Sequence, residues 1–264
     1  MKKIVFALLS TSLLSGLSHA QTRTEIASDN AGNYTTTMWT NNSNGGSGFA
    51  NWSFGNYTAA DDTVTIANSS VNAGNINSPG AGGGAFRIAS NNGGSVEVIR
   101  SFGGSRTLRA GDIFSFDMTL NFRNGNKGFD LRNGGDGVFN FDVRNNEYHF
   151  GVVNLSDTTG QNWSYVDDGV YHLEFEFITE TSMKAKIQRT TSGGTDTYEI
   201  PNVALANPVN NFKFYVSGTD NHNPENSLYF NNLKLSEVPE PHFYGLMAGV
   251  LALLFAGIHR RRRG

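Results

Sequence analysis

Apolar and polar residues alternate with a period of two along several short segments, and this pattern constrains the fold more than any other feature. Five segments place apolar residues at alternate positions, within 114–122, 139–143, 148–152, 173–177 and 212–216. In the first, the apolar residues from Phe114 to Phe122 point one way and the polar residues from Ser115 to Asn121 point the other. Successive side chains of a β-strand point to opposite faces, so the pattern predicts half-buried strands.

Turn-forming residues separate these segments. Glycine accounts for 31 of the 264 residues, and both Gly and Asn tolerate the positive φ that tight turns require. Such residues cluster at 124–125, 133–135, 145–146, 192–194 and 217–218. Many short strands with such turns predict an all-β fold, a two-sheet β-sandwich of the jelly-roll, lectin-like type, over residues 21–237. The segment 227–235, Ser-Leu-Tyr-Phe-Asn-Asn-Leu-Lys-Leu, resembles the last strand of concanavalin-like and carbohydrate-binding jelly-roll domains.

The N-terminal 20 residues have the three parts of a secretory signal peptide. Lys2 and Lys3 are positive, residues 4–17 are largely apolar, and Ser18-His19-Ala20 offers small residues at positions −3 and −1 of a cleavage site. We therefore predict export through the Sec translocon and removal of residues 1–20 by signal peptidase.

The C-terminal 27 residues, 238–264, also have three parts. Val238-Pro239-Glu240-Pro241 comes first, an apolar run follows at 243–258, and Arg260, Arg261, Arg262 and Arg263 precede the terminal glycine. A helix over the 16 residues of the run would be about 24 Å long, short of the roughly 30 Å of a bilayer's hydrocarbon core. The pattern predicts a weakly anchored transmembrane helix whose arginines stay on the cytoplasmic side.

This order of motif, apolar span and arginine cluster is similar to the PEP-CTERM protein-sorting tail of Gram-negative bacteria, which is also labelled an ice-binding-protein C-terminal domain. The resemblance implies recognition by an exosortase, a membrane-embedded cysteine-type processing enzyme, followed by removal of the tail and release or surface attachment. The alternative is a single-pass anchor that is never cleaved. The expected route is export, transient attachment to the inner membrane, and then the cell surface or the extracellular space.

Removal of both ends changes the charge of the chain. Lys2, Lys3 and the four terminal arginines are six of the 20 basic residues, and Glu240 is one of the 23 acidic residues, so the body carries 14 basic and 22 acidic residues, a formal charge of −8. Clustered Lys and Arg, which nucleic-acid binding requires, do not occur in it, and we expect no nucleic-acid partner. The chain has no cysteine, which excludes thiol nucleophiles and thiolate metal sites.

Three tryptophans lie in asparagine-rich surroundings and are the candidate glycan-binding residues. Trp39, Trp52 and Trp163 each lie within two residues of an asparagine, and Tyr34, Tyr57 and Tyr165 accompany them. Protein sites for sugars stack sugar rings on exposed aromatic side chains and bind hydroxyls with amides and carboxylates. The alternative for each tryptophan is a place in the core of the sandwich.

Glu174 and Glu176 are the candidate pair of carboxylates. They lie two residues apart on one predicted strand with His172, and glycosidases need two carboxylates that flank the bond they cleave. The alternative is a solvent-facing stripe opposite the apolar side chains of Leu173, Phe175 and Phe177. The same alternative holds for Asp117, Asp130 and Asp142. Residues 32–41 resemble the first strands of jelly-roll xylanases, but that family's two catalytic glutamates have no counterpart here. We therefore assign no catalytic residue.

The sequence predicts no cofactor and no metal ligand. Asp136 and the segment 220–226 are oxygen-rich and could suit calcium, but neither has the EF-hand spacing. We therefore expect an exported surface or matrix protein that binds exopolysaccharide without catalysis. Two alternatives remain open: a secreted glycan-active enzyme, either glycosidase or lyase, on a jelly-roll scaffold, and a purely structural coat protein.

Overall fold

The structure is a computed structural model that describes residues 23–35, 39–79, 83–122, 124–144, 147–151, 166–238 and 249. The predicted signal peptide, Trp163, Tyr165, the turn at 145–146, Pro239, Glu240, Pro241, the apolar run apart from Gly249 and the arginine cluster lie outside the described residues. Residues Glu25–Glu237 form one compact unit. Among the residues that the structure describes, no helix has the length and apolar character needed to cross a membrane.

One sheet has eight strands, and the last strand of the compact unit lies in its interior. Its order is β12 (Gly194–Ala204), β11 (Ser182–Thr191), β10 (Val170–Thr179), β6 (Ile113–Leu120), β14 (Leu228–Glu237), β4 (Ala85–Ala89) and β3 (Thr63–Ala67), and β1 (Thr24–Asp29) also pairs with β14. Neighbours along this order are antiparallel. The segment 227–235 supplies most of the strand β14, in the middle of the sheet.

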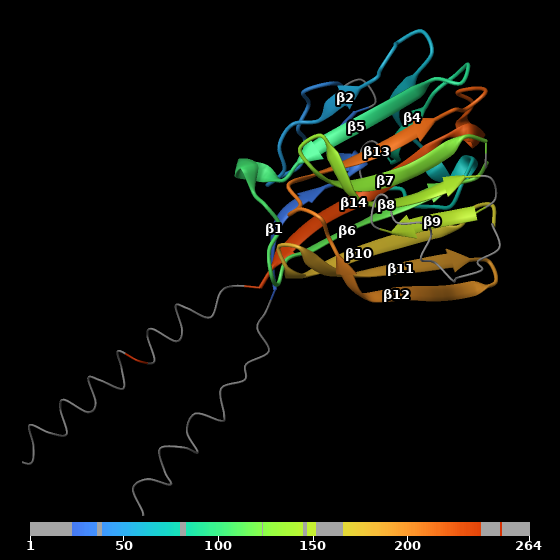
Figure 1. Cartoon of the computed structure of the whole chain (residues 1–264). Coiled ribbons are helices and arrows are strands. Elements are labelled where there is room, and N and C mark those ends of the chain that lie inside the picture. Colours follow the sequence, from blue (N-terminus) through green and yellow to red (C-terminus); the bar gives the residue numbers. More distant parts are fainter. Residues whose placement is uncertain are drawn as a thin grey trace, which may run out of the picture. The chain divides into compact units, whose positions relative to one another are not determined.

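The second sheet has six strands, again with antiparallel neighbours (Figure 1). Its order is β2 (Ser53–Gly55), β5 (Ser95–Ser101), β13 (Asn211–Ser217), β7 (Asn126–Asn133), β8 (Asp136–Arg144) and β9 (Glu147–Gly151). Short 3-10 helices lie at η1 (Ala31–Asn33), η2 (Ser69–Val71), η3 (Gly103–Ser105) and η4 (Pro224–Asn226). The all-β prediction is confirmed.

The predicted turns within the described residues fall between strands. Gly134 has a φ of 56° in the turn between β7 and β8, and Gly125 has a φ of 70° just before β7. A Cβ at Gly125 would lie 2.4 Å from the carbonyl oxygen of Ser217, so this position needs glycine for space as well as for conformation.

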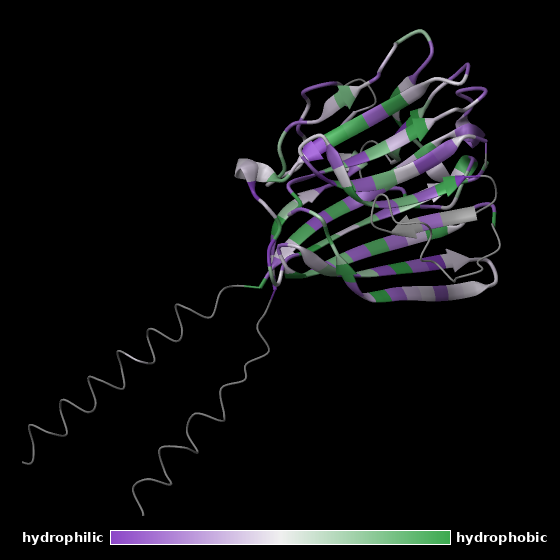
Figure 2. Ribbon diagram, viewed as in Figure 1, coloured by the Kyte–Doolittle hydropathy of each residue, from purple (hydrophilic) through white to green (hydrophobic). Residues whose placement is uncertain are grey.

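Aromatic side chains from both sheets form the core between them. Phe214 of β13 stacks on Phe230 of β14 with ring centroids 3.8 Å apart, and Phe129 of β7 lies 4.4 Å from Phe116 of β6. The two sheets therefore pack face to face as a β-sandwich, and the alternation predicted from the sequence appears along the strands in Figure 2. Each buried phenylalanine contributes about 1.5–3 kcal/mol of hydrophobic free energy.

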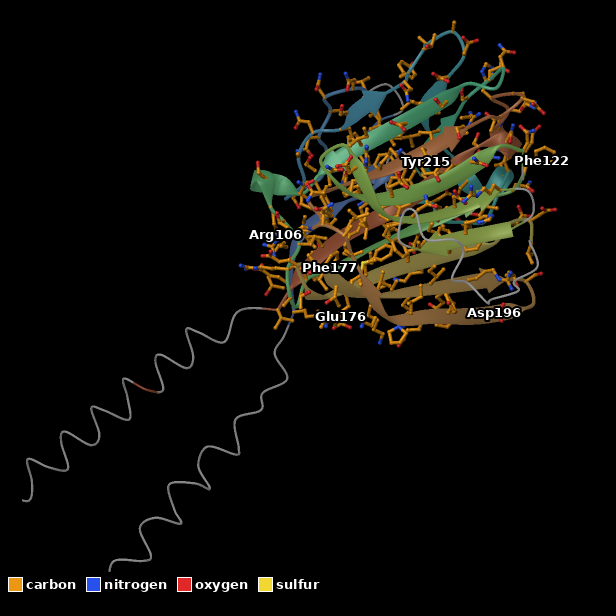
Figure 3. All side chains as sticks on the ribbon, in the orientation of Figure 1. Arg106, Phe122, Glu176, Phe177, Asp196 and Tyr215 are labelled. Carbon is orange, nitrogen blue, oxygen red and sulfur yellow. The ribbon has the colours of Figure 1, made fainter. Side chains whose placement is uncertain are left out.

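Phe122 departs from the predicted alternation. The strand β6 ends at Leu120, and the side chain of Phe122 is 53% exposed at the end of the sandwich (Figure 3). The alternation predicted an inward position, because a sequence pattern does not show where the ladder of hydrogen bonds stops.

Trp39 and Trp52, two of the three candidate glycan-binding residues, lie in the core of the sandwich, which was the alternative for each tryptophan. Their side chains are 2% and 0% exposed, and both belong to the main core cluster. Their rings contact each other at 5.8 Å, and both also lie within 6 Å of the rings of Phe86 and Phe230. The free energy gained by burying such large rings outweighs the preference of the neighbouring polar residues for solvent, and those residues lie in the adjoining loops.

Candidate functional site

A cavity of about 630 Å³ lies between two segments of the chain, one of which joins the edge strands β2 and β3 of the two sheets. One wall comes from residues 54–62, in β2 and the connection from β2 to β3, and the other from residues 90–95, in the connection from β4 to β5 and the first residue of β5. We call this cavity the Tyr57 pocket. Its lining is dominated by amide, hydroxyl and carboxylate side chains, together with the aromatic rings of Phe54 and Tyr57.

Tyr57 supplies an exposed aromatic ring at this pocket. Its side chain is 43% exposed, which is unusual for a large ring in this protein. Phe54 packs against the core and meets the Tyr57 ring edge-on, with centroids 6.1 Å apart and an interplanar angle of 64°. The contact gives Tyr57 a defined orientation on a supported loop.

Asp62 ties the two walls of the pocket together. One carboxylate oxygen accepts the backbone N–H of Thr58 at 2.6 Å, and the other accepts the hydroxyl of Ser90 at 2.6 Å. The Thr58 carbonyl in turn accepts the backbone N–H groups of Asp61 and Asp62, at 3.0 and 2.8 Å. Because Asp62 is 8% exposed, its carboxylate is a structural tie and not a free ligand group.

Asp61 and two asparagines present the polar groups. The Asp61 carboxylate accepts the side-chain amide of Asn92 at 3.3 Å. Asn56 and Asn92 have φ values of 52° and 54°, in the left-handed region that asparagine tolerates better than most residues. This backbone shape turns each loop sharply at the pocket.

A second group of polar side chains lies on the outer face of the six-stranded sheet. The amide of Asn140 donates to the Tyr215 hydroxyl and to Asp130, both at 2.8 Å, and the Tyr215 hydroxyl donates to Asp142 at 2.9 Å. The Lys213 ammonium is 3.1 Å from Asp130 and 4.9 Å from the centroid of the Tyr215 ring. We call these residues the Tyr215 network, and Tyr215 is marked in Figure 3.

The Tyr215 network depends on a glycine in the strand between its members. Tyr215 on β13 must cross β7 to reach Asp142 on β8, and it crosses at Gly128, which is paired with both residues. A Cβ at Gly128 would lie 2.5 Å from the Asp142 Cβ and 2.9 Å from the Tyr215 hydroxyl. Burial raises the pKa of Asp142, and burial followed by the charges of Asp142 and Asp130 raises the pKa of Tyr215.

The candidate pair Glu174 and Glu176 faces away from the core. They are half-buried on the outer face of β10, opposite the buried side chains of Leu173, Phe175 and Phe177, and they pair in register with Lys186 and Lys184 of β11. They therefore belong to a solvent-facing stripe, which was the alternative predicted from the sequence. Asp117 belongs to the same sheet, where it contacts His172 at 2.7 Å, and so lies on a different sheet from Asp130 and Asp142.

The loop 220–226, considered for calcium, contributes the side chain of Asn226 to the surroundings of a buried lysine. The Lys127 ammonium donates to the carbonyls of Phe122 and Asn124, at 2.7 and 2.6 Å, and to the side chain of Asn226 at 2.9 Å. Asp136 begins β8 at an exposed position. Among the described residues, no group of three or more His, Asp or Glu side chains is arranged to hold a metal ion.

Sequence reasoning named Tyr57 only as a companion of the tryptophans and missed the Tyr57 pocket. The two walls lie about 30 residues apart in the chain, and no local pattern links them. The cluster Asn-Tyr-Thr at 56–58, followed by Asp61 and Asp62, was the available signal.

Neither a protein-family model nor a curated protein matches the chain. The solved structures similar to it include a protein of unknown function from Shewanella oneidensis MR-1, 14% identical with a TM-score of 0.49, where the match covers 87% of this chain and 94% of that one. The CBM2 module of an evolved Dit protein of Lactobacillus casei BL23 phage J-1 is 12% identical over 69% of this chain and 92% of the module, with a TM-score of 0.40. A sialidase is 11% identical over 72% of this chain, with a TM-score of 0.44, and the chain spans 17% of its length.

Proposed function

We propose that this protein is an exported cell-surface or extracellular-matrix protein whose sandwich, of the jelly-roll, lectin-like type, binds a glycan without catalysis in the Tyr57 pocket. The observation that carries the proposal is the exposed ring of Tyr57 at a cavity lined by Asn, Asp, Ser and Thr side chains.

The chemistry of the pocket suits a sugar. The C–H groups on one face of a sugar ring pack on an aromatic ring, while its hydroxyls both donate and accept hydrogen bonds. Carboxylates and amides supply acceptors, and the amide of Asn91 or Asn56 supplies donors. A cavity of about 630 Å³ is of the size that small-molecule sites in proteins commonly have.

A glycan-binding screen tests this proposal. The chain from Gln21 to Val238 contains the whole compact unit Glu25–Glu237. We expect it to bind at least one polysaccharide on a glycan array, and Tyr57→Ala to weaken that binding about tenfold, because the stacking contact is lost. Phe122→Ala removes an exposed aromatic ring elsewhere and is the matched control.

Binding that Tyr57→Ala leaves unchanged would place the glycan somewhere other than the Tyr57 pocket. Absence of binding to every glycan on the array would contradict the proposal and favour the third possibility, a structural coat protein without a small ligand.

The Tyr215 network favours a second candidate function, a glycan-active enzyme. Two carboxylates, Asp130 and Asp142, are bridged through Asn140 and the Tyr215 hydroxyl, and burial raises the pKa of Asp142, as a general acid requires. Release of reducing ends from polysaccharides by the purified chain, abolished by Asp142→Asn, would establish this function. If the chain binds a polysaccharide and releases no reducing ends from it, the result supports binding without catalysis.

The route of the protein is a proposal of its own, based on the sequence alone. The signal peptide and the tail 238–264 direct export and then exosortase processing at Val238-Pro239-Glu240-Pro241. Glu240→Ala together with Pro241→Ala should leave full-length protein in the membrane fraction. Unchanged release of the double variant, measured by immunoblotting of cell fractions, would contradict exosortase processing.

A further inference from the structure

The Tyr57 pocket has an uneven charge. Two of its lining residues, Asp61 and Asp62, are acidic, and none of the lining residues that the structure describes is lysine or arginine. Asp62 is occupied by Thr58 and Ser90, as described above. The Asp61 carboxylate, by contrast, is half-buried and accepts a long hydrogen bond of 3.3 Å from Asn92. A carboxylate has room for about four hydrogen bonds, so Asp61 keeps acceptor capacity toward the cavity.

Two basic groups near the pocket, on His222 and Arg87, make their hydrogen bonds to groups other than the Asp61 carboxylate. The His222 ring lies 3.1 Å from the main-chain carbonyl of Asp61, and not against its carboxylate. The Arg87 guanidinium donates to the hydroxyl of Ser227 at 2.8 Å and to the carbonyl of His222 at 2.6 Å. No ion pair of Asp61 with a lysine or arginine occurs among the described residues.

A ligand that supplies the missing positive charge would use both features of the pocket. A hydrogen bond from an ammonium group to a carboxylate is about twice as strong as one between neutral groups. An ammonium group is also attracted to the face of a tyrosine ring, here that of Tyr57. A uronic acid or a sulfated sugar would instead bring a negative charge beside Asp61, into a body with a formal charge of −8.

We infer that the Tyr57 pocket recognises a sugar with a free amino group, with Asp61 binding the ammonium and Tyr57 packing against the sugar ring. This inference rests on the proposed glycan-binding function and adds the chemical class of the ligand. A polysaccharide that contains de-N-acetylated hexosamine is the class of polymer that fits.

Calorimetric titration with three matched oligosaccharides tests the inference. The probes are oligomers of glucosamine, of N-acetylglucosamine and of galacturonic acid, added to the chain Gln21–Val238. At low salt we expect the glucosamine oligomer to bind about tenfold more tightly than the acetylated one, and the galacturonic acid oligomer to bind most weakly. Added salt should reduce the preference, because the contact is ionic.

Two variants separate the role of Asp61 from a general effect of charge. Asp61→Asn keeps the shape of the side chain, and it should reduce glucosamine binding to the level of the acetylated oligomer. Asp136→Asn removes the same charge at the exposed start of β8, outside the pocket, and should leave the preference intact.

The possible outcomes separate the amino-sugar assignment from the proposed glycan-binding function. Equal binding of the two hexosamine oligomers, tighter binding of galacturonic acid, or a preference that survives Asp61→Asn would each overturn the amino-sugar assignment while glycan binding stands. If none of the three oligomers binds, the amino-sugar assignment fails, and the array screen then decides whether the glycan-binding function fails with it.

Discussion

At the scale of single residues, Lys127 stands out as a charged side chain that is fully buried. It occupies an inward-facing position on β7, in line with Phe129 and Leu131, and is 0% exposed. Three oxygen atoms surround its ammonium, but no carboxylate pairs with it among the described residues. Burial lowers the pKa of Lys127 to about 7.

This pKa makes the stability of the protein depend on pH. In the unfolded chain the pKa of a lysine is about 10.4, so between pH 7 and 10 the unfolded state binds more protons than the folded state. The free energy of unfolding should therefore rise as the pH rises from 7 toward 10. Urea unfolding at pH 7.0 and 9.5 measures the rise, and Lys127→Met should remove most of it.

A surface lysine variant is the control for this experiment, and the raised pKa of a buried tyrosine has little effect in this pH range. Lys186→Met, on the half-exposed outer face of β11, should keep the rise of the wild type. Tyr34, whose pKa burial raises to about 12, acts only above pH 10. Identical pH dependence in the wild type and Lys127→Met would show that the buried ammonium is not its source.

At the scale of elements, Gly128 holds three strands of the six-stranded sheet at their observed spacing. Gly128→Ala would place a methyl group 2.5 Å from the backbone oxygen of Phe141, so β7 and β8 must separate or the Tyr215 network must open. We expect a loss of about 1–3 kcal/mol in the free energy of unfolding, measured with urea. Gly135→Ala is the control, because its Cβ would meet no atom within 4 Å.

A loss of the same size in both glycine variants would mean that chain flexibility, and not the close approach at Gly128, determines the effect. The sequence did not predict this position. From the sequence, a glycine within a strand is expected to weaken the strand. Its role follows only from the structure, where the side chain of Tyr215, 87 residues later in the chain, passes over it to reach Asp142.

At the scale of the whole unit, the sequence predicted what repeats locally and missed what joins distant segments. Strands and turns follow from the period of two and from Asn and Gly, because each signal lies within about ten residues. The Tyr57 pocket and the burial of Trp39 and Trp52 depend on which loops meet. The polar residues beside the tryptophans indicate that the adjoining loops are exposed, but they do not indicate where the tryptophan rings lie.

The same limit applies to the link between the two sheets. Arg100 of β5 and Asp29 of β1 form a salt bridge with both side chains fully buried, 71 residues apart. The Arg100 guanidinium also lies over the rings of Phe49 and Trp52, at 5.0 and 4.8 Å, and the Tyr34 hydroxyl donates to Asp29 at 2.7 Å. One ion pair therefore connects a strand of each sheet inside the core.

Removal of one partner of this pair should unfold the unit more easily than any surface change. Arg100→Met leaves the Asp29 carboxylate buried without its counter-charge, which we expect to cost about 3–5 kcal/mol in urea unfolding. Combining it with Asp29→Asn should recover part of the loss, since an amide at this position still accepts the Tyr34 hydroxyl. Lys234→Met breaks the exposed pair with Glu25 that joins β14 and β1, and it should cost less than about 1 kcal/mol. Equal losses for Arg100→Met and Lys234→Met, or no recovery in the double variant, would show that the buried charges do not govern how the two sheets are held together.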